Sequence, residues 1–389
     1  MQYCLRMVIR QFWVNRIEEA WKHRSLVWLR GVRRSGKTVL CQGLSGVEYF
    51  DCEIPRVRQS MEDPEFFLTQ LKGRRVVLDE VHRLQNPSEL LKIATDHFPD
   101  IKIVATGSSS LQASRKFRDT LTGRKWTVDL TPMNQQDGQD FSEKNLIFRL
   151  LRGGLPPFFL SSDVHEIHFQ EWMDSYWARD IQELFRLERR ASFQKCVELA
   201  FVRSGGIFEA TAFAGPCEIS RPTVSHYLRV MEDTRVCTVV RPFSARRSGE
   251  IVSAPKVYGF DTGFVSYYRG WDTSSPEVNG VLWEHYVLNE LLSLESVGSV
   301  HYWRDKQGHD VDFVLAHRGK AWRAIECKWS WRSADLKGLV TFRKRHPGGE
   351  NWVVAPDVTR PFERKEKGLV VSYMNLSDAH SQLLRRKAP

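Results

Sequence analysis

Residues 27–40 read VWLRGVRRSGKTVL, an apolar run that leads through a glycine-bounded loop into a second apolar stretch. The loop has the Walker A spacing G-x-x-x-x-G-K-[ST], which begins at Gly31 and ends in Gly36-Lys37-Thr38. Glycine at both ends lets successive backbone N–H groups turn toward a bound polyphosphate. The pattern therefore predicts a strand over 25–30, a phosphate-binding loop, and a helix that presents its positive end to the anion.

This loop predicts ATP and Mg²⁺ as cofactors, because the lysine would reach the β- and γ-phosphates and the threonine hydroxyl would bind the metal. We expect the nucleotide to contact Gly31, Arg33, Arg34, Ser35, Gly36, Lys37, Thr38 and Val39. A chance match, or a site that no longer binds nucleotide, is the alternative.

A second apolar run, 76–78, ends in two acids that fit the Walker B pattern. Asp79 would hold Mg²⁺ directly or through water, and Glu80 would orient and deprotonate the attacking water. The next predicted strand, 101–105, runs into a Gly/Ser stretch. Ser108 in that stretch is a candidate sensor for the γ-phosphate and the lytic water, with an ordinary turn as the alternative.

The 389 residues exceed one ordinary core, so two or three domains are expected. The formal net charge of +10 suits a polyanionic partner such as DNA without proving one. Seven scattered cysteines without a C-x-x-C pair favour a reducing cytoplasm and argue against a structural zinc. No apolar run approaches the roughly 18 residues that a membrane span needs. We therefore expect a cytoplasmic protein with no membrane partner.

Several further segments accompany these motifs: Leu121-Thr122-Gly123-Arg124, Leu130-Thr131-Pro132, Arg152 to Pro156, and Tyr176 to Leu184. With them the chain resembles AAA-like P-loop ATPases, and more narrowly a prokaryotic group with a G-x-R-R-x-G-K-T loop and a C-terminal domain of unknown function. The resemblance implies an α/β fold whose parallel sheet is covered by helices on both faces. It also implies that Arg124 could act as an arginine finger on a neighbouring subunit in a homo-oligomer. A salt-bridging surface arginine is the alternative. The polar stretch 133–140 departs from the group's apolar and acidic pattern.

The middle of the chain, 192–243, has the pattern of a winged helix-turn-helix. Ser220 would cap a helix with Pro222 in its first turn, and Val224, Leu228 and Met231 fall on one helical face. An apolar strand over 236–240, followed by basic residues, predicts a β-wing. The resemblance implies the same module. Contact with DNA and docking to protein both remain open.

The last third contains Asp312 and Glu326-x-Lys328 on two predicted strands, which is the layout of PD-(D/E)XK nucleases. Period-two alternation puts Glu326 and Lys328 on one face. Asp312 and Glu326 would bind Mg²⁺ while Lys328 orients and acidifies a water. Glu284 would join them from the apolar face of a helix that begins at Gly280. The alternative is a restriction-endonuclease-like domain that binds without cutting.

Downstream of these strands, 329–346 interleaves aromatic residues with cations. Such a stretch could follow a nucleic-acid backbone, or it could be a solvated helix beside a core tryptophan.

We therefore predict four segments. They are an AAA-like P-loop ATPase domain over 1–140, a helical lid or linker over 141–190, a winged helix-turn-helix over 191–250, and a PD-(D/E)XK nuclease-like domain over 251–389. The predicted function is ATP hydrolysis that controls DNA binding or Mg²⁺-dependent DNA cleavage. One alternative is a nucleotide-gated scaffold with an inactive nuclease-like domain that binds a protein partner. The other is a winged-helix DNA-binding regulator.

Overall fold

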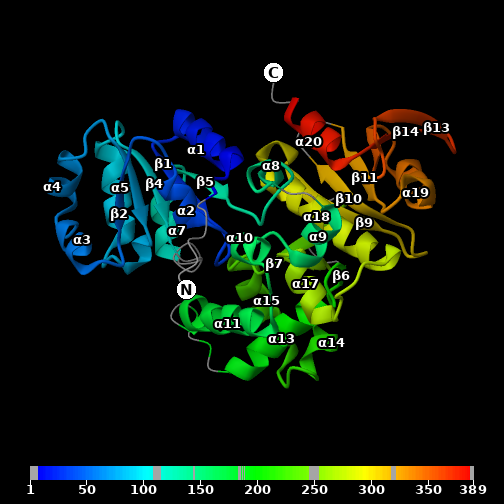
Figure 1. Ribbon diagram of the computed structural model, residues 1–389, viewed down its shortest axis with the longest axis horizontal. Helices are drawn as coiled ribbons and strands as arrows, with labels where there is room; N and C mark the ends of the chain where they lie inside the picture. Colours follow the sequence, from blue (N-terminus) through cyan, green and yellow to red (C-terminus); the bar gives the residue numbers. More distant parts are fainter. Residues whose placement is uncertain are drawn as a thin grey trace. The chain divides into compact units, whose positions relative to one another are not determined.

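The computed structural model describes residues 8–107, 115–142, 145–182, 185, 187, 189–244, 254–316 and 321–385. The chain divides into two compact units (Figure 1). The first unit comprises Met1–Glu143, Leu155–Arg190 and Asp233–Arg235, and the second comprises Lys144–Gly154, Ala191–Glu232 and Val236–Pro389. Among the described residues, no helix is both long and apolar enough to cross a membrane.

The first unit contains a parallel sheet with the strand order β2-β3-β4-β1-β5, which the described residues form with five strands. The strands predicted before the loop and before the two acids are both present. The bounds are β1 Leu26–Arg30, β2 Val47–Asp51, β3 Arg75–Asp79, β4 Lys102–Thr106 and β5 Lys125–Asp129.

Helices cover both faces of this sheet, as expected for a parallel sheet with crossover connections. Successive residues of β1 alternate between two cores, with Val27 and Leu29 on one side and Trp28 on the other. Helices α1 (Gln11–His23) and α2 (Lys37–Gln42) pack on the first face. Helices α4 (Pro64–Thr69), α5 (Pro87–His97) and α7 (Arg115–Leu121) pack on the second. The other elements here are α3 Pro55–Ser60, η1 Val81–Arg83, α8 Asp137–Asp140, α10 Pro156–Leu160, α11 Glu166–Tyr176 and the π-helical turn η2 Trp177–Gln182.

The polar stretch 133–140 is partly buried, and an arginine before α1 pairs with its buried Asp137. Arg10 Nη2 lies 2.5 Å from Asp137 Oδ2, and both side chains are almost fully buried. Arg10 also donates to the backbone oxygens of Ser35 at 3.0 Å and Thr131 at 2.9 Å. The indole of Trp13 donates to the same carboxylate at 3.2 Å. This ion pair therefore ties α1, the phosphate-binding loop and the end of the sheet together.

The second unit contains a mixed sheet with the strand order β13-β14-β12-β11-β10-β9-β7-β8-β6, nine strands within the described ranges. Strand β7 pairs antiparallel with β8 and parallel with β9, so the strands of the predicted wing continue into the C-terminal strands. The bounds are β6 Gly206–Ile207, β7 Cys237–Pro242, β8 Lys256–Gly259, β9 Ser299–Arg304, β10 Asp310–Ala316, β11 Arg323–Cys327, β12 Glu350–Val354, β13 Phe362–Glu366 and β14 Leu369–Met374.

The long helix α18 of this unit spans Pro276–Ser293, four residues longer at its start than expected from Gly280. The Ser275 side chain accepts a hydrogen bond from Val278 N, and proline fits the first turn, which explains the earlier start. The remaining helices are α9 Leu146–Arg152, α13 Arg190–Val202, α14 Ala210–Ala214, α15 Arg221–Asp233, α17 Thr262–Arg269, η3 Glu295–Val297, η4 Trp331–Ser333, α19 Lys337–Arg345 and α20 Leu376–Arg385.

Replacing one partner of the buried Arg10–Asp137 pair should destabilise the first unit strongly. Asp137→Asn would leave the guanidinium buried without its counter-charge, which typically costs about 3–5 kcal/mol. Glu19→Gln breaks an exposed pair with Lys22 on α1 and should change stability little. Guanidinium-induced unfolding of the full chain measures both, and equal effects of the two substitutions would contradict the role given to Arg10.

Candidate functional site

The phosphate-binding loop adopts the shape that its glycines permit. A Cβ on Gly31 would lie 2.6 Å from Leu130 O and 2.8 Å from Ser35 Oγ, so only glycine fits there. Gly36 has φ +95°, in the left-handed region that glycine tolerates best. Helix α2 starts directly afterwards at Lys37. Lys37 Nζ donates to the backbone oxygens of Gly31 at 2.8 Å and Val32 at 3.2 Å, inside the curve of the loop.

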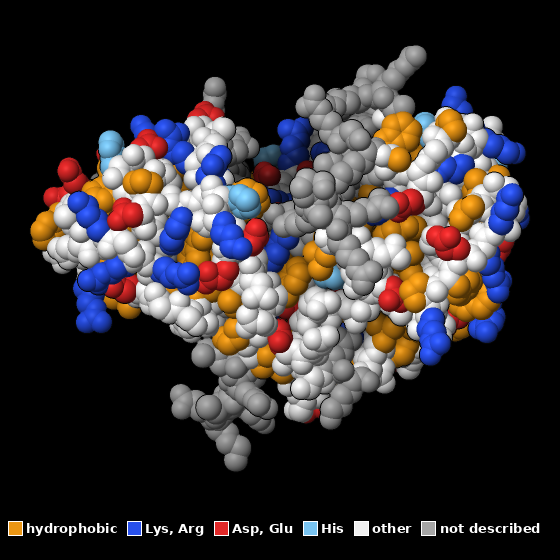
Figure 2. Space-filling view, turned by 90° about the horizontal axis from the view of Figure 1, so that it is seen from above, with side chains coloured by type: hydrophobic (Ala, Val, Ile, Leu, Met, Phe, Trp, Pro, Cys, Tyr) orange, Lys and Arg blue, Asp and Glu red, His pale blue; other side chains and the backbone are white. Residues whose placement is uncertain are grey.

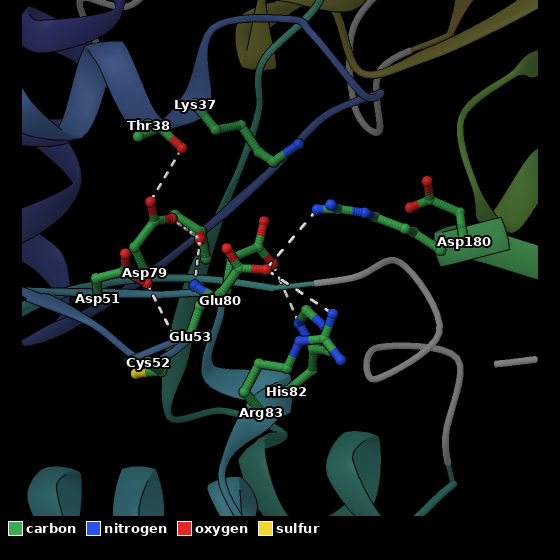
Figure 3. A network of polar contacts seen from close by, with 12 residues as sticks. Lys37, Thr38, Asp51, Cys52, Glu53, Asp79, Glu80, His82, Arg83 and Asp180 are labelled. Atoms are coloured by element: carbon green, nitrogen blue, oxygen red, sulfur yellow. Dashed lines mark hydrogen bonds and ion pairs between the residues drawn. The ribbon is translucent and has the colours of Figure 1, made fainter. Parts of the chain in front are cut away.

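The Asp79 carboxylate lies at the end of β3 and accepts hydrogen bonds from three hydroxyl groups. Thr38 Oγ1 donates to Oδ2 at 3.0 Å (Figure 3). Tyr49 donates to the same oxygen, and Thr106 donates to Oδ1. The structure thus brings the predicted magnesium ligands Thr38 and Asp79 together. A hydroxyl and a carboxylate are oxygen donors that suit Mg²⁺, so these residues fit the metal.

Thr106 is a site residue that our sequence reasoning missed. It ends β4, beside β3, and its Oγ1 accepts a hydrogen bond from Glu80 N at 3.0 Å. The rule that pointed to a polar side chain at the end of this strand applies to Thr106 as well as to Ser108. Ser108 itself lies outside the described residues.

Glu80 is partly buried beside His82, whose Nδ1 lies 3.1 Å from Glu80 Oε2 (Figure 3). Its backbone is left-handed, with φ 57°. Burial opposes ionisation, but the hydrogen bond from His82 and the nearby charge of Lys37 outweigh it and lower the pKa of Glu80 below its usual value. The carboxylate is therefore ready to accept a proton at neutral pH.

A pocket of about 450 Å³ opens beside the loop, a size within the range of small-ligand sites. Seven of the eight loop residues expected to contact the nucleotide line it, namely Gly31, Arg33, Arg34, Gly36, Lys37, Thr38 and Val39. Ser35 is instead fully buried behind the loop. Apolar lining comes from Val8, Phe141, Pro156, Pro157 and Leu160.

The wall opposite the loop includes the π-helical turn η2, which sequence reasoning did not assign to the site. Asp180 Oδ2 lies 3.1 Å from Arg33 Nε, and Arg179 Nη1 lies 3.8 Å from Glu53 Oε1. Trp172 on α11 donates its indole N–H to Arg33 O at 3.2 Å. Burial raises the pKa of Asp180, while the Arg33 guanidinium opposes the rise. Trp172 and Asp180, which lie 139 and 147 residues after Arg33 in the sequence, therefore hold this arginine of the phosphate-binding loop in place.

Arg124 lies on the first unit and forms a two-pronged ion pair with Asp96. Its Nε lies 2.7 Å from Oδ1, and its Nη2 lies 3.1 Å from Oδ2. This geometry matches the salt-bridge alternative. A finger role on a neighbouring subunit stays a prediction.

The predicted C-terminal residues come together on β10 and β11. The antiparallel register pairs Phe313 with Ile325, which sets Asp312 opposite Glu326. Lys328 Nζ lies 3.3 Å from Glu326 Oε1 and 3.9 Å from Asp312 Oδ2. Burial, and then the Asp312 charge, raise the pKa of Glu326.

Glu284 reaches the same region from α18, and two residues of β8 hold it. Tyr258 donates its hydroxyl to Glu284 Oε1 at 2.6 Å, and Lys256 Nζ lies 3.6 Å from that oxygen. Burial and the Asp312 charge raise the pKa of Glu284. Sequence reasoning missed Lys256, although K-x-Y alternation sets Lys256 and Tyr258 on one face of the strand.

The C-terminal acids offer at most a two-carboxylate metal site. Within the described ranges, no three His, Cys, Asp or Glu residues are grouped as metal ligands. Mg²⁺ is often held by only one or two carboxylates and keeps several waters. The carboxylate Oε2 of Glu326 is buried without a hydrogen-bond partner among the described residues, so Asp312 and Glu326 fit such an ion.

The aromatic and basic stretch 329–346 is largely neutralised by its own surroundings. Arg345 pairs with Asp305 at 3.2 Å and Lys337 with Asp335 at 3.4 Å. Arg343 is buried and donates to backbone oxygens. On the face shown in Figure 2, Lys and Arg side chains are scattered among acidic and apolar ones. These contacts match the alternative of a solvated helix more closely than that of a continuous basic track.

Comparisons with known proteins agree with the loop chemistry. The family described as "AAA domain" matches residues 23–138. Two families described as domains of unknown function, DUF8612 and DUF4143, match residues 143–275 and 279–376. Uncharacterised proteins of Mycobacterium bovis and Mycobacterium tuberculosis are each 26% identical over 318 residues, covering 78% of this chain and 70% of theirs.

Two solved structures are similar in part. One is a Walker-type ATPase of Pyrococcus abyssi, with a TM-score of 0.42 and 16% identity, covering 67% of this chain and 95% of that one. The other is a signal-transduction ATPase with a tetratricopeptide repeat sensor from Pyrococcus horikoshii, with a TM-score of 0.29 and 12% identity, covering 74% and 47%. Neither TM-score is high enough to add to the argument. The match to the AAA-domain family over residues 23–138 and the parallel sheet together support a P-loop ATPase-like domain in the first unit.

Proposed function

We propose that this chain binds and hydrolyses ATP with Mg²⁺, and that its nucleotide state controls DNA binding or cleavage by the second unit. The observation that carries the ATPase part is the Asp79 carboxylate, which joins the Thr38 hydroxyl to the strand end that bears Glu80. Lys37, Thr38 and Glu80 line one pocket, and Thr38 contacts Asp79 beside it. This supports our assignment of a phosphate-binding lysine, a metal-binding pair and a general base.

The protein groups would divide the hydrolysis as follows. Lys37 would exchange its two loop carbonyls for phosphate oxygens, and Thr38 and Asp79 would hold the metal. When bound, Mg²⁺ neutralises charge on the β- and γ-phosphates. Glu80, kept ionised by His82, would accept the proton of the attacking water.

The DNA part of the proposal is supported by the order of elements in 191–250, where we assign the winged helix. Helices α13, α14 and α15 are followed by β7, which pairs antiparallel with β8 just beyond this range. Helix α15 buries Val224 and Tyr227, while Arg221 and Arg229 are exposed and suited to phosphates. The basic residues Arg246 and Arg247 of the predicted wing lie outside the described residues.

Cleavage is supported by Asp312, Glu326 and Lys328, in the segment 251–389 that we assign to a nuclease-like domain. The second candidate function is a nucleotide-gated scaffold that binds a protein partner. The observation that favours it is the pairing of all three acids with lysines, two of them with Lys328 and Glu284 with Lys256.

Substituting the general base should separate ATP binding from turnover. Glu80→Gln removes the proton acceptor and should lower the hydrolysis rate by about 10²–10⁴-fold while ATP still binds. Lys37→Ala should weaken binding itself. Phosphate release and binding of a fluorescent ATP analogue measure the two steps, with the exposed Glu62→Gln as the matched control. An unchanged rate in Glu80→Gln would rule out the assigned base.

Removing His82 should shift the acid side of the pH–rate profile. His82 and Lys37 hold the pKa of Glu80 below its usual value, so activity should persist until the pH falls through that lowered pKa. His82→Ala removes the hydrogen bond from His82, so the pKa of Glu80 should rise and the acid limb should move to higher pH. The control is His97→Ala, an exposed histidine in the last turn of α5. An acid limb that stays in place would show that His82 does not tune the base.

The nuclease part is tested by Lys328→Ala in the full chain with Mg²⁺ and DNA, in the presence and absence of ATP. We expect cleavage in the parent that changes with nucleotide and is lost in Lys328→Ala, because no ammonium then orients the water. Lys337→Ala on α19 is the matched surface control. Cleavage that survives Lys328→Ala contradicts the assigned site, and a parent that binds DNA without cutting it favours the binding module.

A further inference from the structure

Two residues of β8 contact Glu284, the acid that α18 contributes next to Asp312 and Glu326. Lys256 Nζ lies 3.6 Å from Glu284 Oε1, and Tyr258 donates its hydroxyl to the same atom at 2.6 Å. Lys328 Nζ, by contrast, lies within 4 Å of Asp312 and Glu326. The Lys256 ammonium therefore pairs with Glu284, and the Lys328 ammonium pairs with Asp312 and Glu326.

Lys256 is built into the site rather than placed on the surface. The residue is only 7% exposed, and a buried lysine is rare unless it is paired. Burial opposes its charge, but Glu284, Asp312 and Asp310 outweigh this and raise the pKa of Lys256. The side chain is thus a permanent cation at neutral pH.

One carboxylate oxygen of Glu326 has no hydrogen-bond partner among the described residues and is a candidate ligand for an additional cation. Oε2 of Glu326 is buried and has no hydrogen-bond partner among the described residues, while Oε1 faces Lys328. Glu326 itself is 4% exposed. Because an unpaired carboxylate oxygen is costly to bury, this atom favours a cation or a proton beside it. Glu284 differs, since its Oε1 already accepts from Tyr258 and faces Lys256.

We propose that Lys256 is a built-in second cation of this cluster, which keeps Glu284 from binding metal and leaves Asp312 and Glu326 as a site for one divalent ion. The inference rests on the proposed metal-dependent function of the second unit. Hydrolases with two metal ions use the pair to stabilise both the attacking and the leaving oxygen of a phosphodiester. Here the lysine ammonium would supply, next to Glu284, the positive charge that a second ion supplies in such enzymes. Lys256 is therefore a positioning residue for Glu284.

The charge balance supports the assignment. Glu284, Asp312, Glu326 and the nearby Asp310 bring four negative charges when ionised, and Lys256, Lys328 and the nearby Arg269 bring three positive ones. One divalent ion can then be accommodated without a large excess of positive charge. A second divalent ion would have to share Glu284 with an ammonium 3.6 Å away, which like-charge repulsion opposes.

Metal stoichiometry tests the proposal without relying on catalysis. The full chain, stripped of metal and without nucleotide, is titrated with Mn²⁺, and free Mn²⁺ is followed by electron paramagnetic resonance. All variants share the same P-loop, so any Mn²⁺ bound there cancels in the comparison. Lys256→Met should bind one more Mn²⁺ per chain than the parent. That gain should vanish in the double variant Lys256→Met/Glu284→Gln and should not occur in Lys256→Arg, which keeps the charge.

Two results would overturn the proposal. One is a Lys256→Met chain with the stoichiometry and affinity of the parent, and the other is a parent that already binds a second Mn²⁺ lost in Glu284→Gln. Asp312→Asn separates the proposed metal site from the proposed role of Lys256. If Asp312→Asn binds as much Mn²⁺ as the parent, the metal site at Asp312 and Glu326 is ruled out. A gain of Mn²⁺ in Lys256→Met that depends on Glu284 would still support the role of Lys256. Should Lys256→Met fail to fold by circular dichroism, Lys256→Gln retains a hydrogen-bond donor and replaces it in the same comparison.

Discussion

The ATPase site depends on how one buried carboxylate is satisfied. Asp79 is 3% exposed, and a buried carboxylate needs hydrogen bonds or a counter-charge. Its described partners are hydroxyl groups from α2, β2 and β4. These donors are neutral, so they bring no counter-charge to the carboxylate. The same contacts fix Thr38 and, through Thr106, the backbone of Glu80.

The second unit satisfies its buried acids in the opposite way. Asp312 and Glu326 face Lys328, and Glu284 faces Lys256 as well as the Tyr258 hydroxyl, so ammonium groups supply positive charge that the hydroxyl donors of Asp79 do not. Breaking such a pair leaves an uncompensated buried charge, which is why each lysine constrains what else can bind. The two clusters therefore differ in electrostatics although both are built from carboxylates at strand ends or on strands. The Asp79 carboxylate is held by neutral donors, whereas the charges of Glu284, Asp312 and Glu326 are partly neutralised by Lys256 and Lys328.

Short sequence motifs predicted those residues of both sites that lie on a single strand or in the turn that follows it. The Walker A and Walker B residues follow their strands directly, so parallel pairing of β1, β4 and β3 brings them to one edge of the sheet. Asp312, Glu326 and Lys328 were predictable because alternation along strands fixes their face. Arg10–Asp137 and Arg33–Asp180 were not, since each joins segments more than 120 residues apart. Lys256 was missed because its role depends on β8 packing next to α18, which no local pattern encodes.

The net charge of +10 is a poor guide to where a polyanion would bind. On α19 and its neighbours, arginines and lysines pair with Asp305 and Asp335 or are buried against backbone oxygens. A phosphate backbone would have to displace those carboxylates. Exposed ion pairs of this kind contribute little stability, but the carboxylates lower the positive potential that would attract a polyanion. Helix α15 offers a different balance, because it buries its apolar face and leaves Arg221 and Arg229 exposed. For the proposed contact with DNA, the charge distribution therefore favours α15 over the aromatic and basic stretch near the C-terminus.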